Sequence, residues 1–61
     1  MNNNIRKGDW VRSTHRNETG VVLGFGIDFL IHRYDTPQYR VLWRSGSISK
    51  NVSKDYLRKI A

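Results

Sequence analysis

The fold class is indicated most clearly by an alternating stretch in the second half of the chain: Tyr39-Arg40-Val41-Leu42-Trp43-Arg44. Every second residue from Tyr39 is aromatic or apolar, and two of the intervening residues are arginines. A period of two is typical of a β-strand with one face in a core and the other in water. Ser45-Gly46 follows as a two-residue turn signal. We therefore predict a tight hairpin, with residues 47–52 as the partner strand.

The same alternation occurs near the start of the chain, over residues 9–14. Val11 and Ser13 fall on one face of such a strand, whereas Trp10 and Arg12 fall on the other. We assign the Val11 face to the core. Trp10 and Arg12 then point outward.

A second apolar segment covers residues 19–25, after a polar break at residues 15–18. Its β-branched residues predict a strand, and Gly20 and Gly24 within it predict a bulge or a tight bend. Residues 26–38 form the longest and least regular connection. For this connection we predict either a strand extension or an ordered loop.

The end of the chain completes the pattern. Ser53 is a good cap for a single helical turn over residues 53–56, and residues 57–60 read as a short closing strand. Five short strands with frequent turn signals predict an all-β fold, a single five-stranded barrel with a single helical turn before the last strand. We assign residues 6–61 to the barrel domain and residues 1–5 to a flexible N-terminus.

Segments across nearly the whole chain resemble SH3-like barrels, the group that includes KOW and Tudor domains. The matching segments are residues 7–12, 19–22, 39–43 with Gly46, and 57–60. Members of this group have many unrelated functions, so the resemblance implies an SH3-like fold and no single activity.

Within that group, the spacing is similar to that of the plasmid-borne type II dihydrofolate reductases. The similar positions are residues 8–12, Thr36-Pro37, Gly46-Ser47 and residues 57–60. Those enzymes are tetramers whose central pore carries a Val-Gln-Ile-Tyr run after the Gly-Ser pair. Here the matching positions hold Ile48, Ser49, Lys50 and Asn51. The resemblance therefore supports the fold, but it does not extend to reductase activity.

Composition favours an anionic partner. The chain of 61 residues carries 11 Lys and Arg against 5 Asp and Glu, a formal charge of +6, and it has no cysteine. Such a charge attracts nucleic acid or acidic protein surfaces, although it also suits a small protein that needs charge for solubility. Without disulfides, membrane spans or a leader-like start, we expect a cytoplasmic protein with no membrane partner.

The candidate site is a cationic and aromatic outer face. Arginine and lysine pair with phosphates, while an aromatic ring stacks on a base. The nucleic-acid-binding candidates are Trp10, Arg12, Arg16, Arg33, Arg40, Arg44 and Lys50. The alternative to a binding site is a structural role, in which Trp10 covers a thin core and the arginines only contact solvent.

Other chemistries find little support in the residues. Phe29, Tyr34, Tyr39 and Trp43 offer an aromatic cage for a methylated cation, but Tyr39 and Trp43 are more often core residues, and the net charge opposes a cationic ligand. His15 and His32 lack partners at metal-ligand spacing. No activated nucleophile is recognisable, and the carboxylates lie at turns. We therefore expect no catalytic residues, no metal and no cofactor.

These observations predict a small non-catalytic binding module, with nucleic acid as the favoured partner. Binding would be directed mostly at the backbone, since nothing marks a helix that reads bases. One alternative is a protein-interaction module or small subunit that docks an acidic protein. Another is a reductase-like homo-oligomer with a different pore ligand.

Overall fold

The protein is described here by a computed structural model, which covers residues 4–32 and 34–60. In chain order its elements are β1 (Trp10–Ser13), β2 (Thr19–Phe25), α1 (Ile27–Ile31), β3 (Gln38–Trp43), β4 (Ile48–Ser53), the 3₁₀ turn η1 (Lys54–Tyr56) and β5 (Leu57–Lys59).

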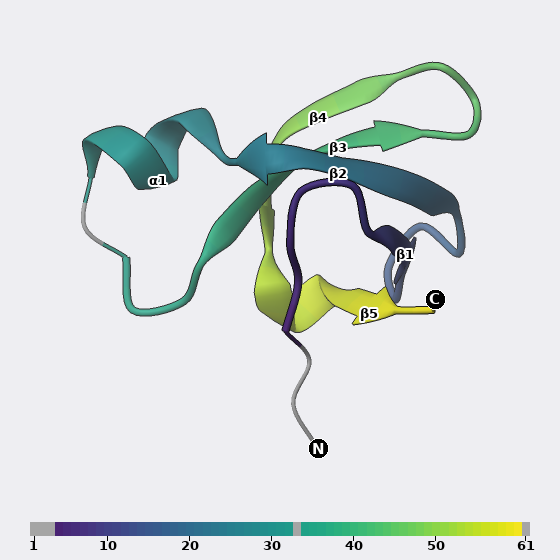
Figure 1. Ribbon diagram of the computed structural model, residues 1–61, viewed down its shortest axis with the longest axis horizontal. Helices are drawn as coiled ribbons and strands as arrows, with labels where there is room; N and C mark the ends of the chain where they lie inside the picture. Colours follow the sequence, from purple (N-terminus) through teal and green to yellow (C-terminus); the bar gives the residue numbers. More distant parts are fainter. Residues whose placement is uncertain (1–3, 33, 61) are drawn as a thin grey trace.

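All five strands belong to one antiparallel sheet in the order β4-β3-β2-β1-β5 (Figure 1). The all-β, five-stranded prediction is therefore confirmed. The helical turn before the last strand is confirmed as well, because the Ser53 hydroxyl accepts the Asp55 N–H at 3.3 Å. The outermost strands, β4 and β5, are joined through η1, and the described residues form no ladder between them. Closure into a barrel, and the SH3-like assignment with it, stay predictions.

The core lies on the inward face of the sheet, as the alternation predicts. Its buried residues are Ile5, Val11, Val22, Tyr39, Val41, Trp43 and Leu57. Ser13 also points inward, and its hydroxyl accepts the N–H groups of His15 and Arg16, so this buried polar side chain is satisfied.

The N-terminal boundary differs from the expected one. Residues 1–5 are predicted to be a flexible extension, but Ile5 is only 7% exposed and packs in the core. A single large apolar side chain gains about 1.5–3 kcal/mol from burial, and this gain offsets part of the entropy cost of ordering the short segment before β1, which is about 1–2 kcal/mol per residue. Residues 1–3 lie outside the described part of the chain.

The hairpin between β3 and β4 has a longer turn than predicted. The Trp43 N–H donates to the Ser47 carbonyl and the Gly46 N–H donates to the Trp43 carbonyl, each at 2.8 Å. Residues 44–46 therefore form the loop, rather than Ser45-Gly46 alone. Gly46 has φ +99°, a backbone conformation that residues with a Cβ rarely adopt. A glycine here suits a three-residue hairpin loop whose last residue is left-handed.

The connection between β2 and β3 begins with the helix α1. The prediction of a strand extension or an ordered loop is therefore wrong for residues 27–31. The Leu30 and His32 N–H groups donate to the Gly26 and Asp28 carbonyls, as in a helix. Asn51 of β4 stabilises the first turn, because its side-chain oxygen accepts the Asp28 N–H at 3.3 Å. This cap comes from a distant strand, so no local sequence signal reveals it.

Gly20 is required by close packing rather than by a bend. A Cβ at this position would lie 2.7 Å from both the Leu42 carbonyl oxygen and Val41 Cγ1, and 2.9 Å from the Trp43 ring. The predicted bulge falls instead between Val22 and Gly24, where the pairing of β2 with β3 shifts register.

We predict that Gly20→Ala lowers the free energy of unfolding by about 1–3 kcal/mol, because the added methyl overpacks the β2–β3 contact. Gly20→Val should cost more. Urea unfolding followed by circular dichroism measures both. In a strand with open space alanine is more stable than glycine, so a neutral or stabilising Gly20→Ala would contradict the packing argument.

Candidate functional site

The outward face of the sheet carries a row of apolar side chains that crosses β4, β3, β2 and β1. The register pairs Trp10 with Val21, Val21 with Leu42, and Leu42 with Ile48. On the other side the Ile60 N–H donates to the Trp10 carbonyl, which extends the row past the end of β5. We call Ile60, Trp10, Val21, Leu42 and Ile48 the apolar row.

Trp10 is the largest member of the apolar row, and its side chain is available for contact. The residue is 48% exposed. An open groove of about 480 Å³ lies beside it, bounded also by Thr19, Val21, Leu42 and Arg44. The idea that Trp10 covers the core is not supported, because Trp10 lies on the opposite side of β1 from buried Val11.

A second row, parallel to the first and displaced by two residues along the strands, is basic. Arg12 pairs with Arg58 of β5 on one side and with Thr19 on the other, and the Arg44 N–H donates to the Thr19 carbonyl. We call Arg58, Arg12 and Arg44 the basic row. Residues two apart on a strand lie about 6.7 Å from one another, so each cation borders the apolar row.

The far side of the apolar row is basic too, through Arg40 and Lys50. Arg40 is half-buried, and its Nε–H donates to the Phe25 carbonyl at 3.0 Å. Lys50 is exposed on β4, next to the register shift between β3 and β4. Arg40 is therefore partly committed to the fold, whereas Lys50 extends into solvent.

The carboxylates of the described residues lie away from this face. Asp9 accepts the Arg6 N–H at 2.8 Å and pairs with Lys59 at 3.5 Å, on the inward side of β1. Glu18 lies in the β1–β2 turn, and Asp28, Asp35 and Asp55 lie on α1, the following loop and η1. The cations of the outward face are thus separated from the described carboxylates, which pair with Lys59 and Arg16 elsewhere on the molecule.

Among the residues that the structure describes, two ionisable groups have pKa values shifted by their surroundings. Hydrogen bonds from Ser45, with a smaller contribution from the charge of Arg16, lower the pKa of Glu18. Burial raises the pKa of the Tyr39 phenol, which favours its neutral form. Neither group lies on the outward face.

Arg16 lies apart from the other predicted site residues. Its guanidinium is 4.9 Å from the centre of the Trp43 ring, pairs with Glu18 at 3.0 Å, and donates to the Ser49 hydroxyl at 3.3 Å. The Trp43 Nε1–H also donates to Ser49, at 2.7 Å. Arg16 therefore covers one end of the core. Arg33, another predicted site residue, lies outside the described residues.

Of the four aromatic residues considered for a cage, three belong to one line of ring contacts that does not include Trp43. Phe25 contacts Phe29 in a tilted arrangement at 5.2 Å and stacks on Tyr39 at 5.6 Å, and Phe29 stacks on Tyr34 at 6.4 Å. Tyr39 is buried, and the Trp43 ring is covered by Arg16. These rings pack on each other instead of enclosing a cation.

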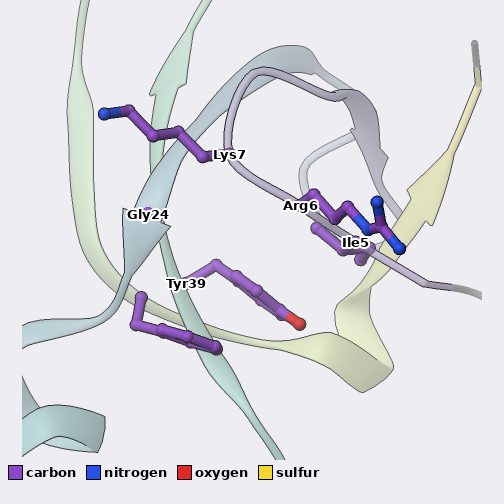
Figure 2. A pocket seen from close by; sticks show the side chains of 6 residues that line it. Ile5, Arg6, Lys7, Gly24 and Tyr39 are labelled. Atoms are coloured by element: carbon purple, nitrogen blue, oxygen red, sulfur yellow. The ribbon is translucent and has the colours of Figure 1, made fainter.

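A separate apolar hollow of about 340 Å³ lies between the N-terminal segment and the β2–β3 pair, with Ile5, Phe25 and Tyr39 in its wall (Figure 2). Figure 2 shows the charged ends of Arg6 and Lys7 pointing in opposite directions, away from this hollow. It offers apolar contact without a converging polar group.

Few other sites emerge from residues 4–32 and 34–60. This part of the chain holds no cluster of three or more His, Cys, Asp or Glu residues that could bind a metal. It also holds no helix of the length and apolar character needed to cross a membrane.

The structure brings together five of the seven predicted site residues on one face: Trp10, Arg12, Arg40, Arg44 and Lys50. Sequence reasoning missed Arg58 and the apolar neighbours Val21, Ile48 and Ile60. Their outward direction follows from alternation, but their positions beside Trp10 and Arg12 require the register between strands. That register depends on pairing of residues far apart in the chain.

Comparisons of the chain with protein-family models, with curated protein sequences and with solved structures found no significant match. The functional argument therefore rests on the geometry of the outward face.

We predict that Arg16→Gln lowers the free energy of unfolding by about 1 kcal/mol, because it removes the cation over Trp43 and the partner of Glu18. Lys7→Gln is the matched control, with the same charge loss at an exposed turn position. It should stay within about 0.5 kcal/mol of the wild type. Equal free energies of unfolding of the two variants in urea would contradict the view that Arg16 stabilises the fold through Trp43 and Glu18.

Proposed function

We propose that this protein binds single-stranded nucleic acid across the outward face of its sheet. The observation that carries the proposal is the half-exposed Trp10 in an apolar row that has cations on both sides, on a face where none of the described carboxylates lies. Bases would contact the apolar row, and phosphates would contact the flanking cations.

Trp10 would supply the stacking surface. Its ring borders the groove that Val21, Leu42 and Arg44 also line, so a base can rest on the indole while its edges meet aliphatic side chains. Stacking on an aromatic ring is worth about 1–3 kcal/mol per base and tolerates any sequence.

The flanking cations would supply the remaining affinity. Arg12 and Arg44 lie on one side of the apolar row, and Arg40 and Lys50 lie on the other. Neutralisation of phosphates releases counterions, so binding of this kind weakens as salt rises.

A single strand fits this face better than a duplex. Stacking on Trp10 requires a base whose ring is open, which a duplex does not offer. Reading of a duplex by a helix in the major groove is also disfavoured. The one α-helix in the described residues, α1, is short and presents apolar Ile27, Leu30 and Ile31 to solvent at the edge of the molecule (Figure 1).

We predict that a fluorescently labelled oligothymidine binds with a logarithmic salt slope of about −2 to −3, as expected for three or four phosphate contacts. The affinity should then fall about 15- to 60-fold between 50 and 200 mM salt. Fluorescence anisotropy gives both values. Absence of binding by the wild type at 50 mM salt would reject the proposal, and equal affinity for a duplex would reject its single-strand part.

We further predict that Trp10→Leu weakens binding about 5- to 150-fold, because it keeps an apolar side chain but removes the stacking ring. The salt slope should not change, since no phosphate contact is lost. Tyr34→Leu is the control, because it removes an aromatic side chain that is 42% exposed on a different surface. Similar affinities of the two variants would argue against stacking on Trp10.

A second candidate function uses the same face to dock an acidic protein. An apolar centre with a charged rim is the usual anatomy of a protein interface, and the apolar row between its cations has this arrangement. If this candidate is right, a partner from nuclease-treated native lysate is retained by the wild type and lost by Arg44→Glu, while oligothymidine fails to bind. Loss of every partner on nuclease treatment argues against it.

A further inference from the structure

The side chains of Arg12 and Arg58 lie next to one another on the outward face. They are paired residues in the antiparallel β1–β5 ladder, where directly opposite side chains have Cβ atoms about 4.5–5.5 Å apart. Both are exposed. Like charges in this position destabilise a sheet unless an anion lies between them.

No carboxylate of the described residues relieves that repulsion. The outward neighbours along the two strands are Trp10 and Ile60 on one side and Thr14 on the other. The Arg58 side chain forms no ion pair with another residue that the structure describes. An external anion bound between the two guanidinium groups would relieve the repulsion.

The two arginines also share a hollow of about 230 Å³, together with Ser13, Thr14 and Asn17. Arg12 is oriented there by Asn17, whose side-chain oxygen accepts a hydrogen bond from the guanidinium. Asn17 has φ +52°, so the turn presents this oxygen from a left-handed backbone position. One of the two cations is therefore held in place before any ligand binds.

We infer that Arg12 and Arg58 form a site for one backbone phosphate of the bound strand, an inference that rests on the proposed function. A guanidinium fork pairs with carboxylate and phosphate alike. The two non-bridging oxygens of a phosphodiester allow two guanidinium groups to bind one phosphate, one oxygen each. The pair is assigned to phosphate because the ligand of the proposed function is a nucleic acid.

This site defines the path of the strand. Trp10 and Arg12 are two residues apart on the same face, about 6.7 Å, a gap that one nucleotide spans between its base and its phosphate. Arg44 lies two strands further along the basic row, roughly 10 Å from Arg12, and meets a following phosphate. The nucleic acid would therefore cross β5, β1, β2 and β3 perpendicular to the strands, with bases on the apolar row and phosphates on the basic row. Its further phosphates would reach Arg40 and Lys50, which complete the three or four contacts of the proposed function.

The test compares Arg58→Gln, the double variant Arg12→Gln with Arg58→Gln, and Lys7→Gln, with oligothymidine binding measured over a range of salt. If both arginines hold one phosphate, Arg58→Gln weakens binding about tenfold with little change in the salt slope, because Arg12 still neutralises that phosphate. The double variant should then reduce the slope by about 0.7, the value for a single phosphate. Lys7→Gln should leave the slope unchanged.

Each other outcome has a distinct meaning. A slope reduced by about 1.4 in the double variant means two separate phosphates and overturns the shared site. Affinities and slopes equal to those of Lys7→Gln overturn the site while leaving the proposed function intact. Failure of the wild type to bind at all rejects the proposed function, and the phosphate site with it.

Arg58→Lys separates geometry from charge. It keeps the cation but loses the planar fork, so we expect weaker binding with an unchanged slope. Wild-type affinity of Arg58→Lys would contradict the paired-fork geometry. Circular dichroism of each variant confirms that the sheet is intact.

Discussion

The contact between Gly20 and the β3 strand determines how the rest of the sheet is arranged. Because Gly20 has no side chain, the Leu42 carbonyl and the Trp43 ring approach β2 closely, and Gly20 is held opposite Trp43. A slip of one residue would exchange the two faces of the strand and drive Leu42 and its arginine neighbours toward the core. The separation of apolar interior from cationic exterior therefore depends on this single register.

The two faces of the sheet use arginine for different purposes. On the inward side, Arg16 covers the Trp43 ring and is balanced by Glu18, so its charge is neutralised within the fold. On the outward side, Arg12 and Arg58 face each other, and none of the described carboxylates lies on that face. The first arrangement stabilises the protein alone, whereas the second leaves electrostatic repulsion that the proposed anionic ligand would relieve.

The fold class was predictable because its signals are local. Alternation identified Val11, Tyr39 and Trp43 as inward residues, and Ser53 marked the turn before β5. The helix α1 was not predictable in this way, since Asn51 caps it from another strand. The candidate face was predictable only in part. Local alternation gives the outward direction of Arg12 and Arg44, but only strand pairing places Arg58 beside Arg12.

The cations at the open edges of the sheet also affect how copies of the protein interact with one another. β4 and β5 are terminal strands, and an edge with unpaired backbone groups can add a strand from another copy of the chain. Lys50 on β4 and Arg58 on the three-residue β5 place charge at these edges, where a second, equally basic copy would be repelled. The charges proposed to attract an anionic ligand therefore also oppose edge-to-edge aggregation, and this protection weakens wherever salt or a bound polyanion screens them.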